Sequence, residues 1–110
     1  METTTEQEGD VLIIKIIGRL TANCAEEFKQ SLLTSAKNSK KILLDLSQMD
    51  YIDSTGLGVL VFTHQETTHQ GGQLKLAAPQ PKPDKVFEIT RTKNILEVFS
   101  DVDTALNSFK

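Results

Sequence analysis

The sequence predicts one α/β domain, in which a mixed central β-sheet carries helices packed on it. Aliphatic runs at residues 11–17 and 42–46 have the composition of buried strands. Between them, residues 24–36 place apolar side chains at helical spacing, and a strand–helix–strand order implies a right-handed crossover between parallel neighbours. The chain has 110 residues, enough for one core and too few for two, so we expect residues 1–110 to form a single domain.

A hairpin is expected at the start of the chain. Gly9 and Asp10 form a turn signal before the first aliphatic run, which can pair with a short strand near residues 3–7. In the helix that follows, Asn23 and Glu26 have the spacing of a capping box. The apolar face of this helix consists of Ala25, Phe28, Leu32 and Ala36.

A second helix is predicted from Ser54 to about Gln70, ended by a Gly-Gly pair, and residues 73–77 form the next strand. Residues 78–83, Ala-Pro-Gln-Pro-Lys-Pro, are expected to be a connector, because proline disrupts helix interiors and central strands. A helix over residues 84–91 and a short apolar segment at 95–99 should follow. The last helix places Val102, Ala105, Leu106 and Phe109 on one face and closes the domain.

Composition excludes several functions. Twelve basic and fifteen acidic side chains give a net charge of -3, which provides no long-range attraction for nucleic acid or anionic lipid. One cysteine, Cys24, cannot form an internal disulfide, and with two histidines it is too little for a structural zinc site. No secretory leader is visible, and no apolar run approaches the ~20 residues that span a bilayer. We therefore expect a cytoplasmic protein with no metal, no cofactor and no membrane anchor.

The residues that join the central strand to the second helix, 49–60, carry the most informative chemistry. A dinucleotide-binding loop would need a small residue where Val61 stands, and a P-loop would need lysine and a hydroxyl residue where Val59 and Leu60 stand. A nucleophile elbow would need a glycine two residues before the serine, where this chain has Ile52. On a common helix, His64 would lie roughly 15 Å from Ser54, too far to take its proton. We therefore expect no enzyme activity.

The run Asp-Ser-Thr-Gly-Leu-Gly-Val-Leu at 53–60 resembles the signature of STAS domains, specifically of bacterial anti-sigma-factor antagonists. The predicted order of strands and helices is similar to that of this family over nearly the whole chain. Gly18-Arg19-Leu20 resembles the glycine-containing turn of the family before its first helix. Many members carry an aspartate soon after that turn, where this chain has Thr21.

The resemblance implies a phosphorylation switch. Ser54 would be phosphorylated by a partner anti-sigma factor with serine kinase activity, and a protein phosphatase would reverse it. The unmodified form would bind the anti-sigma factor and release the sigma factor. The partner-binding residues that the resemblance implies are Thr21, Asp53, Ser54, Thr55, Gly56, Leu57, Gly58 and Val59.

Physical reasoning agrees with such a switch. A phosphate adds about -1.5 to -2 charge, which a helix N-terminus tolerates, whereas a partner that covered it would bury a charge at a cost of roughly 2 to 5 kcal/mol. Three alternatives stay open at this point. Ser54 can be only a helix cap, the domain can be a permanent scaffold subunit of a regulatory or transport complex, or the turn can bind a nucleotide.

Helical spacing divides the apolar side chains of the second helix between two surfaces. Leu57, Leu60 and Val61 fall on one face and are predicted to be core, whereas Val59 and Phe62 point elsewhere and can face a partner. We expect Gly56 and Gly58 to serve a contact, because two glycines in a first helical turn cost roughly 1 kcal/mol each against alanine. His64 and His69 are expected to be exposed to solvent.

Overall fold

A computed structural model describes all 110 residues. Five strands form one sheet in the order β1-β2-β3-β4-β5. Only β1 and β2 are antiparallel, so the sheet is mixed, as predicted. The strands are β1 (Glu2–Glu8), β2 (Val11–Leu20), β3 (Lys41–Ile52), β4 (Gln73–Ala77) and β5 (Val98–Phe99).

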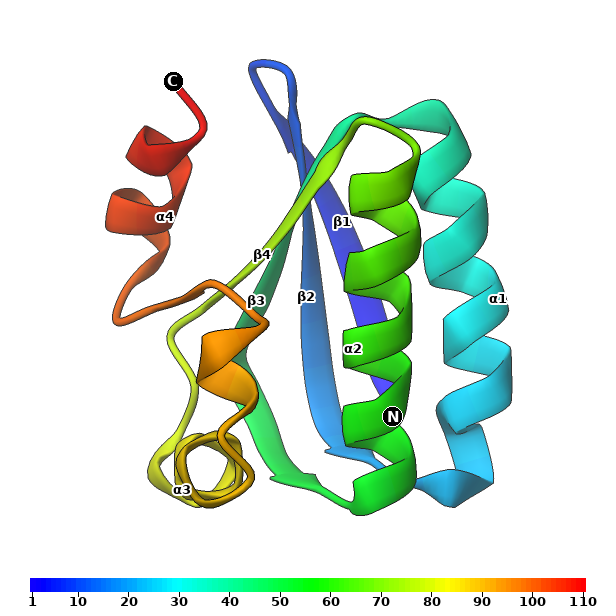
Figure 1. The fold of residues 1–110 in the computed structure, drawn as a ribbon, viewed down its shortest axis with the longest axis vertical. Helices are drawn as coiled ribbons and strands as arrows, with labels where there is room; N and C mark the ends of the chain where they lie inside the picture. The colour runs from blue at the N-terminus through cyan, green and yellow to red at the C-terminus, as the bar shows by residue number, and fades with distance from the viewer.

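Helices cover both faces of this sheet. Helices α1 and α2 lie side by side on one face, and α4 lies on the other (Figure 1). The helices are α1 (Ala22–Asn38), α2 (Ser54–His69), α3 (Pro81–Ile89) and α4 (Val102–Ser108), with a 3-10 turn, η1 (Thr92–Asn94), after α3. None of the helices combines the length and apolarity that a membrane crossing requires.

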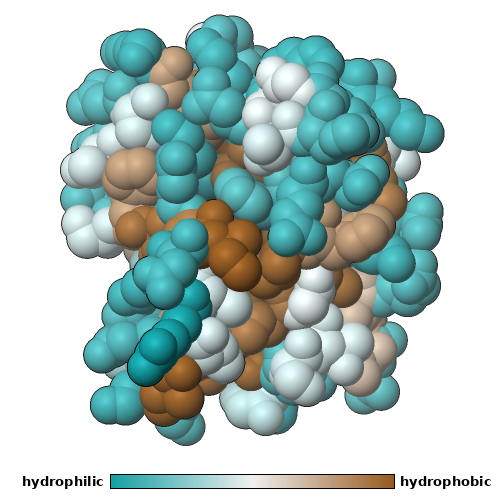
Figure 2. Space-filling model, viewed as in Figure 1, coloured by the Kyte–Doolittle hydropathy of each residue, from teal (hydrophilic) through white to brown (hydrophobic).

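Successive side chains of β2 and β3 lie on opposite faces of the sheet, so their apolar residues form two separate clusters. Ile14, Ile16 and Leu44 face α1 and α2 and belong to the main core of 19 residues. Val11 and Leu43 face the other way and pack with α4 in a smaller cluster. In the view of Figure 2 hydrophilic residues cover most of the periphery, and apolar residues gather across the middle of this face.

Most predicted elements are confirmed. The hairpin turns at Gly9, which has a positive φ of 62°, and β2 and β3 are parallel neighbours joined through α1. Helix α2 begins at Ser54, and Gly71 follows its end with a φ of 84°, a conformation that glycine adopts without strain.

Three local predictions are wrong. Thr21, not Asn23, is the N-cap residue of α1, and its side chain makes no capping bond, because a carboxylate from another turn takes that role. Helix α3 begins at Pro81, three residues earlier than predicted, since proline in a first helical turn gives up only an N–H that would be unpaired anyway. Gly18 belongs to β2, where it lies at a register shift with a φ of 98°.

Candidate functional site

The candidate site lies where two parallel strands end and two helices begin. Leu20 and Ile52 are paired at the carboxyl ends of β2 and β3, and α1 and α2 start within two residues of them. The backbone N–H of Asp53 donates to the carbonyl of Leu20 at 3.2 Å. This bond holds the two strand-to-helix turns together, so residues 31 or more positions apart in sequence form one surface.

Asp53 caps both helices. Its Oδ1 accepts a hydrogen bond from the Gly56 N–H of α2 at 2.8 Å, and its Oδ2 accepts one from the Ala22 N–H of α1 at 2.9 Å. Both N–H groups belong to first helical turns, which have no partner within their own helix. The bonds from Gly56 and then Ala22 hold the pKa of this carboxyl below its ordinary value of 3.8. Asp53 is therefore the ionised residue that fixes the geometry of the site.

Ser54 is the first residue of α2, and its side chain is exposed. Because the capping oxygens come from Asp53, the exposed Ser54 hydroxyl is not needed as a cap. Thr55 is exposed beside it, and Thr21 is half-buried in the neighbouring turn. The structure thus brings Thr21, Asp53, Ser54 and Thr55 together.

The two glycines of the motif differ in their surroundings. A Cβ added at Gly56 would lie 2.5 Å from the carbonyl oxygen of Leu20 and 2.8 Å from its Cγ. A Cβ at Gly58 would meet nothing within 4 Å. Gly56 is therefore required for close packing of α2 on β2, which corrects the expectation of a contact role. Gly58 is exposed and leaves open backbone surface next to Ser54.

Leu57 and Val59 are buried, with exposed fractions of 8% and 7%, and both belong to the main core. The core position predicted for Leu57 is confirmed, whereas the outward direction predicted for Val59 is wrong. The reason is that α2 packs against the sheet on one side and α1 on another, so a wider arc of the helix is covered than a single apolar stripe.

Phe62 is 42% exposed, as the spacing allowed. Ser54, Gly58 and Phe62 follow one another at intervals of four residues, which places them on the same outer face of α2. The Lys29 ammonium of α1 lies 5.0 Å from the centre of the Phe62 ring. An apolar ring and a cation thus extend the exposed surface beyond the serine.

Sequence reasoning did not single out Arg19 and Tyr51 as a pair. The Arg19 guanidinium lies 4.5 Å from the centre of the Tyr51 ring, and Tyr51 is 41% exposed. They are register partners on β2 and β3, just before the two turns. Only the pairing of the strands, which the local sequence does not encode, could have connected them.

Neither histidine lies beside Ser54 at the start of α2. His64 lies on the same helix, half-buried, with its Nδ1 3.2 Å from the carbonyl oxygen of Leu74, so the prediction that it is exposed to solvent is wrong. His69 is exposed at the end of α2, farther from Ser54.

Comparisons with known proteins cover nearly the whole chain. The family model described as "STAS domain" matches residues 2–105. The chain is 31% identical to the anti-sigma-B factor antagonist of Bacillus subtilis over 93 residues, which cover 84% of each chain. The structure of TM1081 from Thermotoga maritima matches 96% of this chain and 92% of its own, with 27% identity and a TM-score of 0.90.

A structure of the Bacillus cell fate determinant SpoIIAA in its phosphorylated form matches 99% of this chain and 100% of its own. The identity is 18% and the TM-score 0.73, so this match shows a shared fold alone.

Proposed function

The chain belongs to the STAS domain family, and from this premise we propose that it is a cytoplasmic anti-sigma factor antagonist switched by phosphorylation of Ser54. The unphosphorylated form binds an anti-sigma factor with serine kinase activity and so releases a sigma factor, and a protein phosphatase restores this form. The observation that carries the proposal is that Asp53 caps α2 and leaves the exposed Ser54 hydroxyl free.

The geometry supports a switch that leaves the fold intact. A phosphate on Ser54 would lie at the N-terminus of α2, where the helix dipole favours negative charge. The bonds that hold the two turns together are made by Asp53 and by backbone groups, and none of them uses the serine side chain. Phosphorylation should therefore change the surface and not the packing. SpoIIAA, whose structure has this fold, occurs in unphosphorylated and phosphorylated forms.

The electrostatics support loss of binding after modification. The new charge would lie next to the ionised Asp53, and a partner that covered the turn would have to desolvate both. An uncompensated buried charge costs roughly 2 to 5 kcal/mol, which weakens binding by about thirtyfold to several thousandfold. Such a factor is large enough to release the partner.

The docking surface in this proposal includes Thr21, Ser54, Thr55 and Gly58, and continues along α2 to Phe62. These residues are exposed or half-buried, and they lie on adjacent turns or on one helix face. Gly56, Leu57 and Val59 act indirectly, because their burial fixes the position of the first turn of α2.

The test begins by isolating the partner on immobilised wild-type protein from extract of the native cells, and by measuring binding of the purified partner calorimetrically. Ser54→Asp should weaken binding by about thirtyfold or more. The control is Ser54→Asn, because asparagine has nearly the same shape as aspartate but no charge. This variant should bind the partner within a few fold of wild type. Full-strength binding by Ser54→Asp would contradict the switch.

Phosphorylation is tested separately with the purified partner and radiolabelled ATP. The wild type and Thr55→Ala should incorporate phosphate, whereas Ser54→Ala should not and should still bind. Incorporation of label into Ser54→Ala would show that another residue is the phosphate acceptor. A stable assembly whose composition ignores the state of Ser54 would favour a scaffold subunit instead.

A further inference from the structure

Strand β1 forms an open edge of the sheet. All seven residues, Glu2 to Glu8, are exposed. Its pairing with β2 runs in unbroken register from Glu2 opposite Ile17 to Glu8 opposite Val11, without a bulge. In an edge strand of this kind, every second residue directs its backbone N–H and C=O away from the sheet. The strand contains no proline, so these groups form a regular unpaired ladder.

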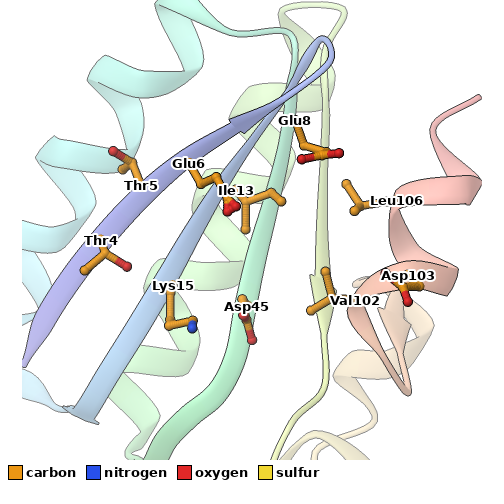
Figure 3. A pocket seen from close by; sticks show the side chains of 10 residues that line it. All are labelled: Thr4, Thr5, Glu6, Glu8, Ile13, Lys15, Asp45, Val102, Asp103 and Leu106. Carbon is orange, nitrogen blue, oxygen red and sulfur yellow. The ribbon is translucent and has the colours of Figure 1, made fainter.

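One face of this edge is acidic. Glu2, Thr4, Glu6 and Glu8 alternate along β1 and share the face that carries α4; we call these residues the acidic row. Figure 3 shows Glu6 and Glu8 beside a hollow of about 340 Å³ between the hairpin and α4. Asp45 and Asp103 also line this hollow, and Lys15 is the one basic side chain among its lining residues. The local field at this edge is therefore negative.

The opposite face of the edge has a different character. A hollow of about 180 Å³ lies between β1 and α1. It is lined by Met1, Thr3, Cys24, Glu27, Phe28 and Ser31. A strand added next to β1 would direct alternate side chains to this side, where small or apolar groups fit against Thr3 and Phe28.

A second copy of the chain does not suit this edge. If two β1 strands paired antiparallel about Thr5, Glu2 of one copy would lie opposite Glu8 of the other. Like charges directly opposite one another destabilise a strand pair, whereas opposite charges stabilise it. Charge complementarity therefore favours a basic strand from a different protein.

We propose that the β1 edge binds an extended basic segment of a partner protein by strand addition. Lysine or arginine at every second position of that segment contacts the acidic row, and the alternating small or apolar residues face α1. Main-chain bonds to β1 supply affinity, and the alternating side chains supply specificity. This surface is separate from the Ser54 turn and goes beyond the switch proposed above.

The probe is a terminally blocked peptide, Lys-Thr-Lys-Val-Lys-Thr-Lys, added to the isotope-labelled full chain. NMR should show shift changes in β1 and slower hydrogen exchange of its outward-facing amides. A peptide of the same composition with its lysines grouped together should bind at least about tenfold more weakly, because its charges cannot align with the acidic row. Equal binding of the two peptides, or no change in β1, would overturn the proposal.

Two matched double variants each replace two glutamates by lysine, one on β1 and the other on α2 and α3. Glu6→Lys/Glu8→Lys changes only exposed side chains, so the fold should persist, and binding of the lysine peptide should fall by about ten- to thirtyfold. A peptide with glutamate in place of each lysine should bind this variant more tightly than it binds the wild-type protein. Glu66→Lys/Glu88→Lys makes the same change of net charge on α2 and α3 and should cost less than about threefold.

An equal loss in both variants would show that only net charge matters and would refute the proposal. Sedimentation of the free chain should show a monomer. A concentration-dependent dimer with protected β1 amides would identify a second copy as the occupant and would equally overturn it.

Discussion

Exchanging each glycine of the Ser54 turn for alanine should give opposite changes in stability. Gly56 and Gly58 lie two residues apart in α2, and each substitution adds one methyl group. At Gly58 the added Cβ meets no atom within 4 Å. At Gly56 it would lie 2.5 Å from the Leu20 carbonyl oxygen, which also accepts the Asp53 N–H. That oxygen cannot move without disturbing the bond between the two turns.

The magnitudes follow from these contacts. Alanine gains about 1 kcal/mol over glycine within a helix. Gly58→Ala should therefore be stabilised by up to about 1 kcal/mol, because nothing opposes this gain. Overpacking typically costs about 1–3 kcal/mol, and a contact of 2.5 Å with a backbone oxygen places Gly56→Ala in the upper part of this range, at about 2–3 kcal/mol. After the gain in propensity, Gly56→Ala should therefore lose about 1–2 kcal/mol. The two variants should differ by about 2–3 kcal/mol.

The assay is urea unfolding followed by circular dichroism, with thermal unfolding as a check. A difference of 2–3 kcal/mol corresponds to roughly 8–12 °C in Tm for a domain of this length. Gly58→Ala is the matched control, since its composition, helix and added volume are the same. Equal stabilities of the two variants, or a more stable Gly56→Ala, would refute the close approach of α2 to β2.

Two further predictions concern charged groups. The lowered pKa of Asp53 means that its contribution to stability is present above pH 3.8 and is lost as the pH falls through the folded-state value. Asp53→Asn should therefore be less stable than wild type at neutral pH, with the gap closing in urea titrations from about pH 5 to pH 2. Asp50→Asn, the control at an exposed carboxylate, should change stability by less than about 0.5 kcal/mol at neutral pH. The Lys75 ammonium is buried and donates to the backbone oxygen of Ser108 at 3.1 Å, so Lys75→Ala should cost about 1–3 kcal/mol and speed hydrogen exchange in α4. Glu97→Gln should cost less than about 1 kcal/mol, because Glu97 is exposed, and a larger loss in Glu97→Gln than in Lys75→Ala would contradict this account.

The sequence by itself predicted most of the secondary structure and the pairing of the first three strands. Aliphatic runs, glycine turns and the helical spacing of apolar residues are local signals, and the right-handed crossover rule orders the strands that they define. The same local pattern at 53–60 located the Ser54 turn at the start of a helix. Local signals failed at Asn23, whose spacing matched a capping box that does not form.

Tertiary structure decided which side chains of the turn are surface. Asp53 caps α1 as well as α2, a role that depends on the approach of two turns 31 residues apart. Gly56 faces Leu20 and Gly58 faces solvent, although both are glycines of one motif. Val59 became core because α1 and the sheet cover α2 from two sides. A sequence encodes the periodicity of an element, but the direction from which other elements pack on it follows only from the assembled fold.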